Sequence, residues 1–213
     1  MTRTRKTFIL LLKLKGFSVD EFEETQDDAP EVPRVEVINS LAELNVFALP
    51  RDINYESYVE LLNFLALHPD EAVLYCAGSG GDVDYGLASV DLIRKHGKVT
   101  GILVGAAYSC SSVIYAACSK RYVGRYGFLG VHRPYINDTH GNSTQLSGHG
   151  TGLSISHRQM VEVYVEASQR DSKWWNDKLN KTREGFFTRL NAETLVSIGM
   201  ASAWNFEIKK EST

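Results

Sequence analysis

The chain has little cysteine, little net charge and no long apolar run. Its three cysteines, Cys76, Cys110 and Cys118, show no pair with the close spacing of a zinc site. A chain of 213 residues buries a core without disulfides, so we expect a reducing compartment. A formal net charge of −3 gives no electrostatic reason to expect nucleic acid. No apolar run approaches the roughly 18 residues that a membrane span needs, and the expected location is therefore the cytoplasm.

The N-terminal residues differ in composition from the rest. Basic residues precede a short apolar stretch that stops at Lys13, with no small-residue cleavage site after it, which does not fit a secretory signal peptide. Residues 20–33 carry several acidic side chains and two prolines, a composition typical of a solvated linker. We expect an N-terminal arm and acidic linker over 1–34, one folded domain over 35–204 and a charged tail over 205–213.

Short apolar strands alternate with amphipathic helices in the expected domain. This order favours parallel strands joined by right-handed crossovers, with helices on the faces, and hence an α/β fold. Residues 136–154 are polar and rich in Gly, Ser and Thr, and are expected to form a loop. A long helix is expected over 156–179. The remaining expected strands are 34–38, 45–49, 71–77, 99–105, 121–124 and 128–131. The remaining expected helices are 55–67, 83–96, 110–118 and 192–198, the last stopped by Gly199.

The centre of this pattern is the stretch around Ser109. An apolar, β-branched run ends at Gly105, small residues lead to Ser109, and a second apolar run follows at once. That pattern indicates a strand, a sharp turn and a buried helix. At the carboxyl end of a parallel strand, the N–H groups of the next helix attract negative charge, so a serine there is placed to act as a nucleophile. A serine at such a turn can equally cap the helix through its side-chain oxygen.

Two further features stand at the ends of neighbouring strands, the Gly80-Gly81 pair and His132. A serine hydroxyl is a weak nucleophile until a base takes its proton, and histidine is the usual base. Backbone N–H groups at a glycine turn and at a helix start can bind an oxyanion. A histidine before Arg-Pro is also compatible with a simple hydrogen bond to a loop. The other histidines fit ordinary structural roles, and none forms a metal-ligand pair on one helix face, so neither a metal nor a cofactor is expected.

Three stretches resemble the motif blocks of the Clp protease proteolytic subunit and of the Clp-like head maturation proteases of phages. They are Gly78-Ser-Gly-Gly-Asp-Val-Asp-Tyr-Gly-Leu-Ala88, Gly105-Ala-Ala-Tyr-Ser-Cys-Ser-Ser-Val-Ile-Tyr-Ala-Ala117 and Gly130-Val-His-Arg-Pro134, in the family's order. The resemblance implies that Ser109 is the nucleophile and His132 the general base. It also implies that the backbone N–H groups of Gly81 and Cys110 form the oxyanion hole.

The same resemblance implies a fold and an assembly. The fold is the Clp/crotonase-like arrangement of repeated β-β-α units with a protruding handle helix. The handle is the long helix from Ser156, through which subunits pair, so a homo-oligomeric ring is expected. A peptide or unfolded protein is the expected substrate, and an ATPase unfoldase or other Clp-like subunits are the candidate partners.

The resemblance does not place the third member of a catalytic triad. Aligning 191–199 with the family's last helix puts Phe186 or Phe187 where the family has its orienting aspartate. Our candidate is Glu184, which lies a few residues off, and Asp177 and Asp171 lie on the preceding helix. Ser111 is a competing nucleophile, but the ungapped match from Gly105 to Ser109 favours the earlier serine.

Three functions are compatible with these observations. The first is a serine endopeptidase of the Clp type, which hydrolyses peptide bonds through a Ser/His acyl-enzyme. The second is a catalytically attenuated Clp-like scaffold or regulatory ring subunit, which the missing aspartate favours. The third is a crotonase-type enzyme acting on an acyl thioester, which shares the fold and a two-N–H oxyanion hole but needs no Ser/His pair.

Overall fold

The computed structural model describes residues 45–136, 142–181 and 187–204. They lie in a compact unit that spans Ile38–Thr213. Several expectations fall outside the described residues: the arm and acidic linker over 1–34, the strand over 34–38, the candidate acid Glu184 and the tail over 205–213.

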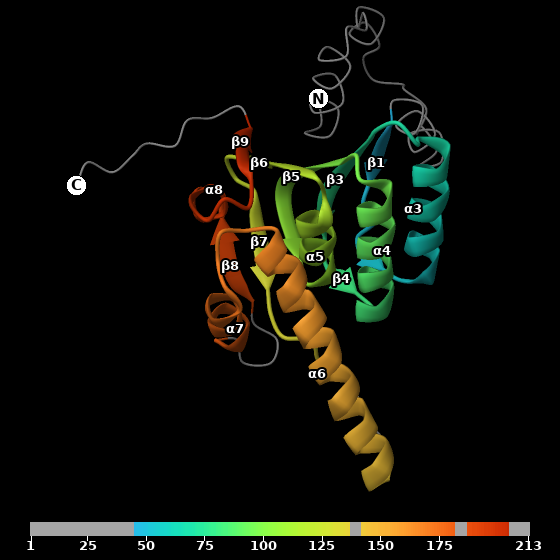
Figure 1. The fold of residues 1–213 in the computed structure, drawn as a ribbon, viewed down its shortest axis with the longest axis vertical. Coiled ribbons are helices and arrows are strands. Elements are labelled where there is room, and N and C mark those ends of the chain that lie inside the picture. Colours follow the sequence, from blue (N-terminus) through green and yellow to red (C-terminus); the bar gives the residue numbers. More distant parts are fainter. Residues whose placement is uncertain (1–44, 137–141, 182–186, 205–213) are drawn as a thin grey trace, which may run out of the picture. The chain divides into compact units, whose positions relative to one another are not determined.

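The core of this unit is a mainly parallel β-sheet (Figure 1). Its strand order is β1 (Val46–Ala48), β3 (Ala72–Gly78), β5 (Val99–Tyr108), β6 (Lys120–Gly124), β9 (Ser202–Trp204). Two strands branch from this path: β7 (Phe128–Val131) pairs in parallel with β5, and β8 (Thr188–Asn191) pairs antiparallel with β7. A second, small parallel sheet joins β2 (Asp52–Ile53) and β4 (Gly80–Gly81). The predicted α/β class with parallel strands is therefore confirmed.

Strand β5 is longer than the sequence predicted. It continues past Gly105, where we expected it to end, as far as Tyr108. Gly105 has a φ of 104°, which glycine adopts at little cost, so the strand is irregular there but does not stop. The residues before this irregularity pair with β6, and the residues after it pair with β7. Strand β7 therefore runs beside the last residues before Ser109.

Three helices cover the sheet as predicted: α3 (Tyr55–Leu67), α4 (Val83–His96) and α5 (Cys110–Ala117). Helix α4 packs between α3 and α5, and α5 lies on β3 and β5 (Figure 1). The Asp82 carboxylate caps α4 by accepting hydrogen bonds from the N–H groups of Asp84 and Tyr85, which fixes the helix start directly after β4. The predicted short C-terminal helix is also present as α8 (Ala192–Ser197), with Asn191 as its N-cap.

The segment between β7 and β8 differs from the prediction. Helix α6 (Ser143–Glu166) begins within the segment expected to be a loop, and α7 (Ser172–Asn180) is a separate helix, so the single helix expected over 156–179 was wrong. The Asp171 carboxylate caps α7 and marks the break. At the start of α6, the side chains of Asn142 and Gln145 each accept a hydrogen bond from the other's backbone N–H, at 3.0 and 2.9 Å. This capping box begins a helix that apolar periodicity does not reveal.

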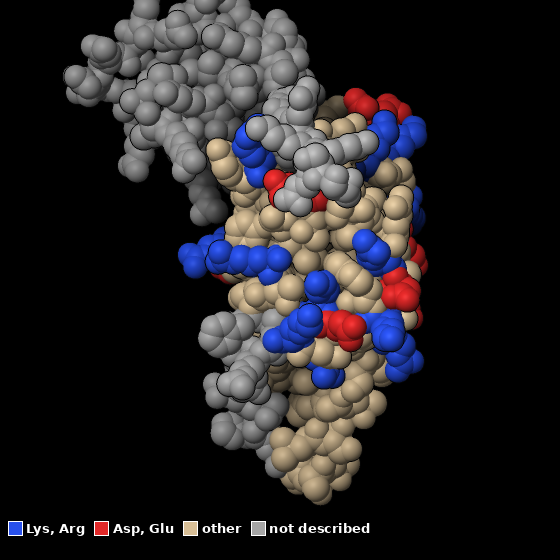
Figure 2. Space-filling model, turned by 90° about the vertical axis from the view of Figure 1, so that its left-hand side faces the viewer, with Lys and Arg blue, Asp and Glu red and all other residues tan. Residues whose placement is uncertain are grey.

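The first half of α6 is exposed, apart from the half-buried Leu153. Figure 1 shows this half running away from the other labelled elements, and Figure 2 shows its surface free of Lys, Arg, Asp and Glu. Because side chains over 143–155 meet no core, their sequence carries no apolar stripe. The role of α6 as a handle between subunits remains a prediction.

A half-buried arginine, Arg121, ties the layers together. The Arg121 guanidinium donates to the carbonyl oxygens of Met200, Ala116, Cys118 and Ala167, which belong to α5, to the end of α6 and to the approach to β9. All three cysteines are free and buried.

In the described ranges, no helix combines the length and apolarity that crossing a bilayer requires.

Candidate active site

A cavity of about 660 Å³ brings together the residues that the sequence singled out. Ser109, Cys110, His132 and Gly81 all line it, although they come from three separate parts of the fold. Ser109 and Cys110 lie where β5 meets α5, His132 follows β7, and Gly81 ends the small strand β4. Four of the five predicted site residues therefore share one cavity, while Glu184 lies outside the described residues.

Ser109 has a strained backbone at the turn between β5 and α5. Its φ of 50° and ψ of −127° lie in a region that residues with a side chain rarely adopt, at a cost of about 1–3 kcal/mol. It occupies the N-cap position of α5, yet its side chain makes no capping hydrogen bond. The Ser109 hydroxyl therefore does not cap α5, which was the alternative role that the sequence left open.

Backbone hydrogen bonds hold this turn in place. The Ser109 N–H donates to the Gly130 carbonyl of β7 at 2.9 Å. The Ser109 carbonyl accepts from the Ser112 N–H at 2.9 Å and from the Ser112 hydroxyl at 2.6 Å. Both sides of the strained residue are thus anchored, one to the sheet and the other to the first turn of α5.

The glycine turn lies directly against the serine turn. A Cβ atom on Gly80 would lie 2.5 Å from the Ser109 Cβ and 3.0 Å from the Cys110 nitrogen. The φ of Gly80 is 92°, so both the space and the backbone conformation require glycine. Because Cys110 is the first residue of α5, its N–H has no acceptor within the helix. A backbone donor without an acceptor inside the helix therefore lies next to the glycine turn.

The competing serine is placed differently. Ser111 is fully buried, and its hydroxyl has no hydrogen-bond partner among the described residues. It faces the backbone of β3, since a Cβ on Gly78 would lie 2.9 Å from its Oγ. Ser111 is not among the cavity-lining residues, whereas Ser109 is. Of these two serines, only Ser109 is placed to meet a substrate in the cavity.

His132 follows β7 and lines the same cavity as Ser109, although its Nε2 forms no hydrogen bond with the Ser109 hydroxyl. Tyr108 of β5 pairs with Gly130 of β7, so Ser109 and His132 leave the sheet at the same edge of neighbouring strands. Such strands are about 4.8 Å apart. The His132 side chain is buried, and its Nε2 has no hydrogen-bond partner among the described residues. Burial lowers the pKa of His132, and a hydrogen bond with the Arg133 backbone opposes this effect. The imidazole is therefore neutral at pH 7 and able to accept a proton.

Aromatic rings surround the imidazole where a triad would have a carboxylate. The Phe187 ring lies edge-on to His132 with 4.7 Å between centroids, and the Tyr135 ring lies at 5.3 Å. Phe187 also packs on Tyr108, with 4.8 Å between centroids. Asp171 caps α7 and Asp177 is exposed, and neither hydrogen-bonds to His132. Phe187, one of the two positions that the alignment gave to the family's aspartate, therefore places an aromatic ring beside His132, while Phe186 lies outside the described residues.

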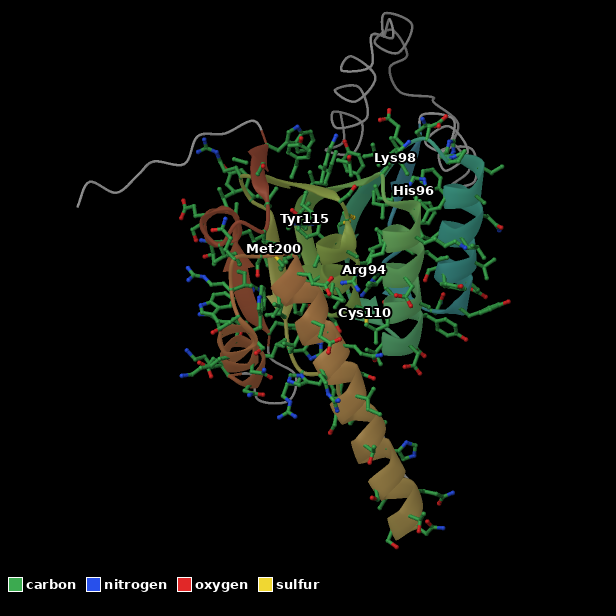
Figure 3. The ribbon with its side chains drawn as sticks, in the orientation of Figure 1. Arg94, His96, Lys98, Cys110, Tyr115 and Met200 are labelled. Atoms are coloured by element: carbon green, nitrogen blue, oxygen red, sulfur yellow. The ribbon has the colours of Figure 1, made fainter. Side chains whose placement is uncertain are left out.

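Cys110 joins the serine turn to the glycine turn. Its thiol donates to the Gly81 carbonyl at 3.4 Å, and its side chain fills the space that a Cβ on Gly86 of α4 would need. Figure 3 shows Cys110 at the start of α5, beside α4. Burial raises the pKa of Cys110 to about 11, with smaller opposing contributions from hydrogen bonds to Ser109 and Gly81. The thiol is therefore protonated at neutral pH and does not compete with Ser109 as a nucleophile.

Sequence reasoning missed one wall of the cavity. Gly148, His149, Gly152 and Ser156 of α6 line it, but most of this segment was expected to be a loop. The signal that could have found this wall is the Asn142-x-x-Gln145 capping box. Among the described residues, no group of three or more His, Cys, Asp or Glu side chains could hold a metal ion.

The fold and the site together define an α/β protein with a serine, a histidine and a glycine turn at one sheet edge. A sequence model of the Clp protease family matches residues 34–201, which is well over half of the chain. The chain therefore belongs to the Clp protease family, whose members typically form oligomeric rings and act on peptides. A comparison with curated proteins gave no match.

Proposed function

We propose that this protein is a serine endopeptidase of the Clp type, with Ser109 as nucleophile and His132 as general base. The observation that carries the proposal is the meeting of a strained, uncapped serine and a buried, neutral histidine in one cavity. Membership of the Clp protease family supports it independently, because that match does not depend on the geometry. The proposed substrate is a peptide or an unfolded segment of a protein.

The proposed reaction proceeds through an acyl-enzyme. The Ser109 Oγ attacks the peptide carbonyl carbon while the unpartnered Nε2 of His132 accepts the hydroxyl proton. His132 then gives this proton to the leaving amine as the C–N bond breaks. A water molecule, deprotonated by the same nitrogen, hydrolyses the ester and restores the Ser109 hydroxyl.

The negative charge on the carbonyl oxygen needs donors that are already in place. The proposed donors are two backbone N–H groups. One belongs to Cys110, which follows Ser109, and the other belongs to Gly81, which follows Gly80. Support comes from the 3.0 Å approach of the Gly80 Cβ position to the Cys110 nitrogen. The hydrogen bond from the Cys110 thiol to the Gly81 carbonyl also holds the two turns together. Removing one such donor typically costs about 10²–10³-fold in turnover.

The test is covalent labelling of the full chain with a fluorophosphonate probe, followed by peptide mapping. We expect the label on Ser109, its loss in Ser109→Ala and its retention in Ser111→Ala, the matched control two residues away. Absence of labelling, or labelling that survives Ser109→Ala, would refute the proposed nucleophile. Acyl-thioester hydrolysis that survives Ser109→Ala would instead support crotonase-type chemistry.

One observation favours a second candidate, an attenuated ring subunit. The Phe187 ring packs against His132, and Phe187 is one of the two positions that the alignment gives to the aspartate. Without an orienting acid, the imidazole is free to take the wrong tautomer, which costs about 10⁴-fold in turnover in a Ser-His-Asp enzyme. Labelling of Ser109 with peptide turnover near background would favour this candidate. In either case we propose a homo-oligomeric ring in which α6 serves as the handle.

A further inference from the structure

A buried chain of hydroxyl groups links the serine turn to α6. The Ser112 hydroxyl donates to the Ser109 carbonyl at 2.6 Å and lies 2.7 Å from the Tyr164 hydroxyl. Ser112 and Tyr164 are both completely buried. They are distant in sequence, so the contact joins the first turn of α5 to the second half of α6.

Counting hydrogens fixes the direction of this chain. A serine hydroxyl has a single hydrogen, and that of Ser112 is used on the Ser109 carbonyl. Tyr164 must therefore donate to the Ser112 oxygen. Burial raises the pKa of Tyr164 well above its ordinary value, so this phenol keeps its proton and remains a donor. The hydrogen bonds run in one direction, from α6 through Ser112 to the residue in the strained conformation.

The phenol of Tyr164 is itself held rigidly. Its ring stacks on Trp175 of α7, with 4.6 Å between centroids and 18° between planes. The Trp175 indole N–H donates to the Ser168 hydroxyl at 2.9 Å, and that hydroxyl donates to the Tyr164 carbonyl at 2.7 Å. Trp175 is completely buried, so α6 and α7 together present the phenol at one position.

We propose that Ser112 and Tyr164 are positioning residues that hold Ser109 in its strained backbone conformation. The proposal rests on the proposed function, since it gives a role in catalysis to residues that do not touch the substrate. Strain persists in a protein only where surrounding contacts over-determine the conformation. Ser109 has backbone anchors on both sides, and the Tyr164–Ser112 pair adds a third anchor on its carbonyl. The reactive geometry therefore depends on where α6 lies.

The variant Tyr164→Phe removes the last donor and keeps the stacked ring. A net hydrogen bond contributes about 0.5–1.5 kcal/mol, so the rate constant for inactivation by the fluorophosphonate should fall about two- to thirteenfold. The affinity for the probe should not change, because the cavity keeps its lining residues. The acid limb of the pH profile should also stay where it is, because it reports on His132.

Tyr115→Phe is the matched control. Tyr115 is another buried tyrosine, and its hydroxyl donates to the Tyr122 carbonyl at 3.1 Å. It lies at the other end of α5 from Cys110 (Figure 3). Both variants lose one buried hydroxyl, and we expect similar losses of stability. Slower inactivation should be confined to Tyr164→Phe.

A double variant tests whether Tyr164 acts through Ser112. We expect Ser112→Ala with Tyr164→Phe to be no slower than Ser112→Ala alone, because the second change removes a contact that is already lost. Additive losses would show that Tyr164 does not act through Ser112, and would overturn the proposed route from α6 to Ser109. Equal inactivation rates for Tyr164→Phe, Tyr115→Phe and the unaltered chain would overturn the positioning role.

Hydrogen exchange separates this inference from the proposed function. The amides of 109–113 should exchange faster in Tyr164→Phe than in Tyr115→Phe, whether or not Ser109 reacts with the probe. Unchanged exchange would overturn the inference even in an active enzyme. Faster exchange in a chain that is never labelled would support the inference and refute the peptidase.

Discussion

Replacing Phe187 by aspartate places a carboxylate next to His132. The centroid of the Phe187 ring is 4.7 Å from that of the His132 imidazole. An aspartate at position 187 has a shorter side chain, which begins at the same backbone position beside the imidazole. An opposite charge within about 4–6 Å raises the pKa of a histidine by roughly 1–3 units. Burial now lowers this pKa below 6.5, and the variant should bring it above that value.

The same carboxylate should accelerate the chemistry, because it stabilises the imidazolium that forms as Ser109 attacks. A grafted acid lacks the supporting contacts of an evolved triad, so we expect a gain of at least about tenfold rather than the full 10⁴ of an orienting acid. Loss of the partly buried ring, which also packs on Tyr108, should cost about 1–2 kcal/mol of stability.

The assay is the rate of fluorophosphonate inactivation measured from pH 5 to 9, for Phe187→Asp and for Phe187→Asn. The asparagine variant loses the same ring and has nearly the same shape, but it carries no charge. We expect the acid limb of the aspartate variant to shift to higher pH and its plateau to rise above that of the asparagine variant. Identical profiles for the two variants would refute the assignment of His132 as the base.

Three further predictions concern stability. Because the pKa of His132 is lowered on folding, the free energy of unfolding should fall as the pH drops from about 6.5 towards the folded-state pKa. Urea unfolding measured at pH 7.5 and at pH 5.5 should show a smaller difference between the two pH values in His132→Gln than in the unaltered chain. Gly80→Ala should abolish labelling of Ser109 and cost at least about 1–3 kcal/mol, since its Cβ would lie 2.5 Å from the Ser109 Cβ. Its control, Gly150→Ala, lies in exposed helix with nothing within 4 Å and should be stabilising by up to about 1 kcal/mol. Arg121→Met should lower the free energy of unfolding by at least about 3 kcal/mol, because it leaves the carbonyl groups of Met200 and Ala167 without their charged donor. The control is Arg158→Met at an exposed position, which should change the free energy of unfolding little.

The positions of Ser109 and His132 could be predicted from sequence, because they depend only on where strands end and helices begin. An apolar run, a serine and a second apolar run fix a strand, a turn and a helix, and parallel strands bring their carboxyl ends to one edge. Ser109 and His132 were located in this way, and the pairing of Tyr108 with Gly130 accounts for their meeting. Their catalytic roles were assigned through the resemblance of three motif blocks to the Clp protease family, and these roles stay a prediction.

Other features depend on contacts that leave no local pattern. The first half of α6 is exposed, so no apolar stripe marks it, and only the Asn142–Gln145 capping box indicates a helix. The contact of Ser112 with Tyr164 joins two residues that look ordinary within their own helices. Such a polar pair is specified by the packing of α5 on α6, which single-sequence patterns do not contain.

The contacts around the proposed catalytic pair, Ser109 and His132, hold these residues in position but bring no charge to the imidazole. Backbone bonds to Gly130 and Ser112 position Ser109, and the rings of Phe187 and Tyr135 position His132. None of these contacts supplies a charge that would stabilise an imidazolium. A defect in positioning, as in Gly80→Ala, should therefore remove labelling altogether. The missing charge should instead slow labelling and leave its site unchanged, which is why adding one carboxylate at Phe187 should increase the rate without rebuilding the site.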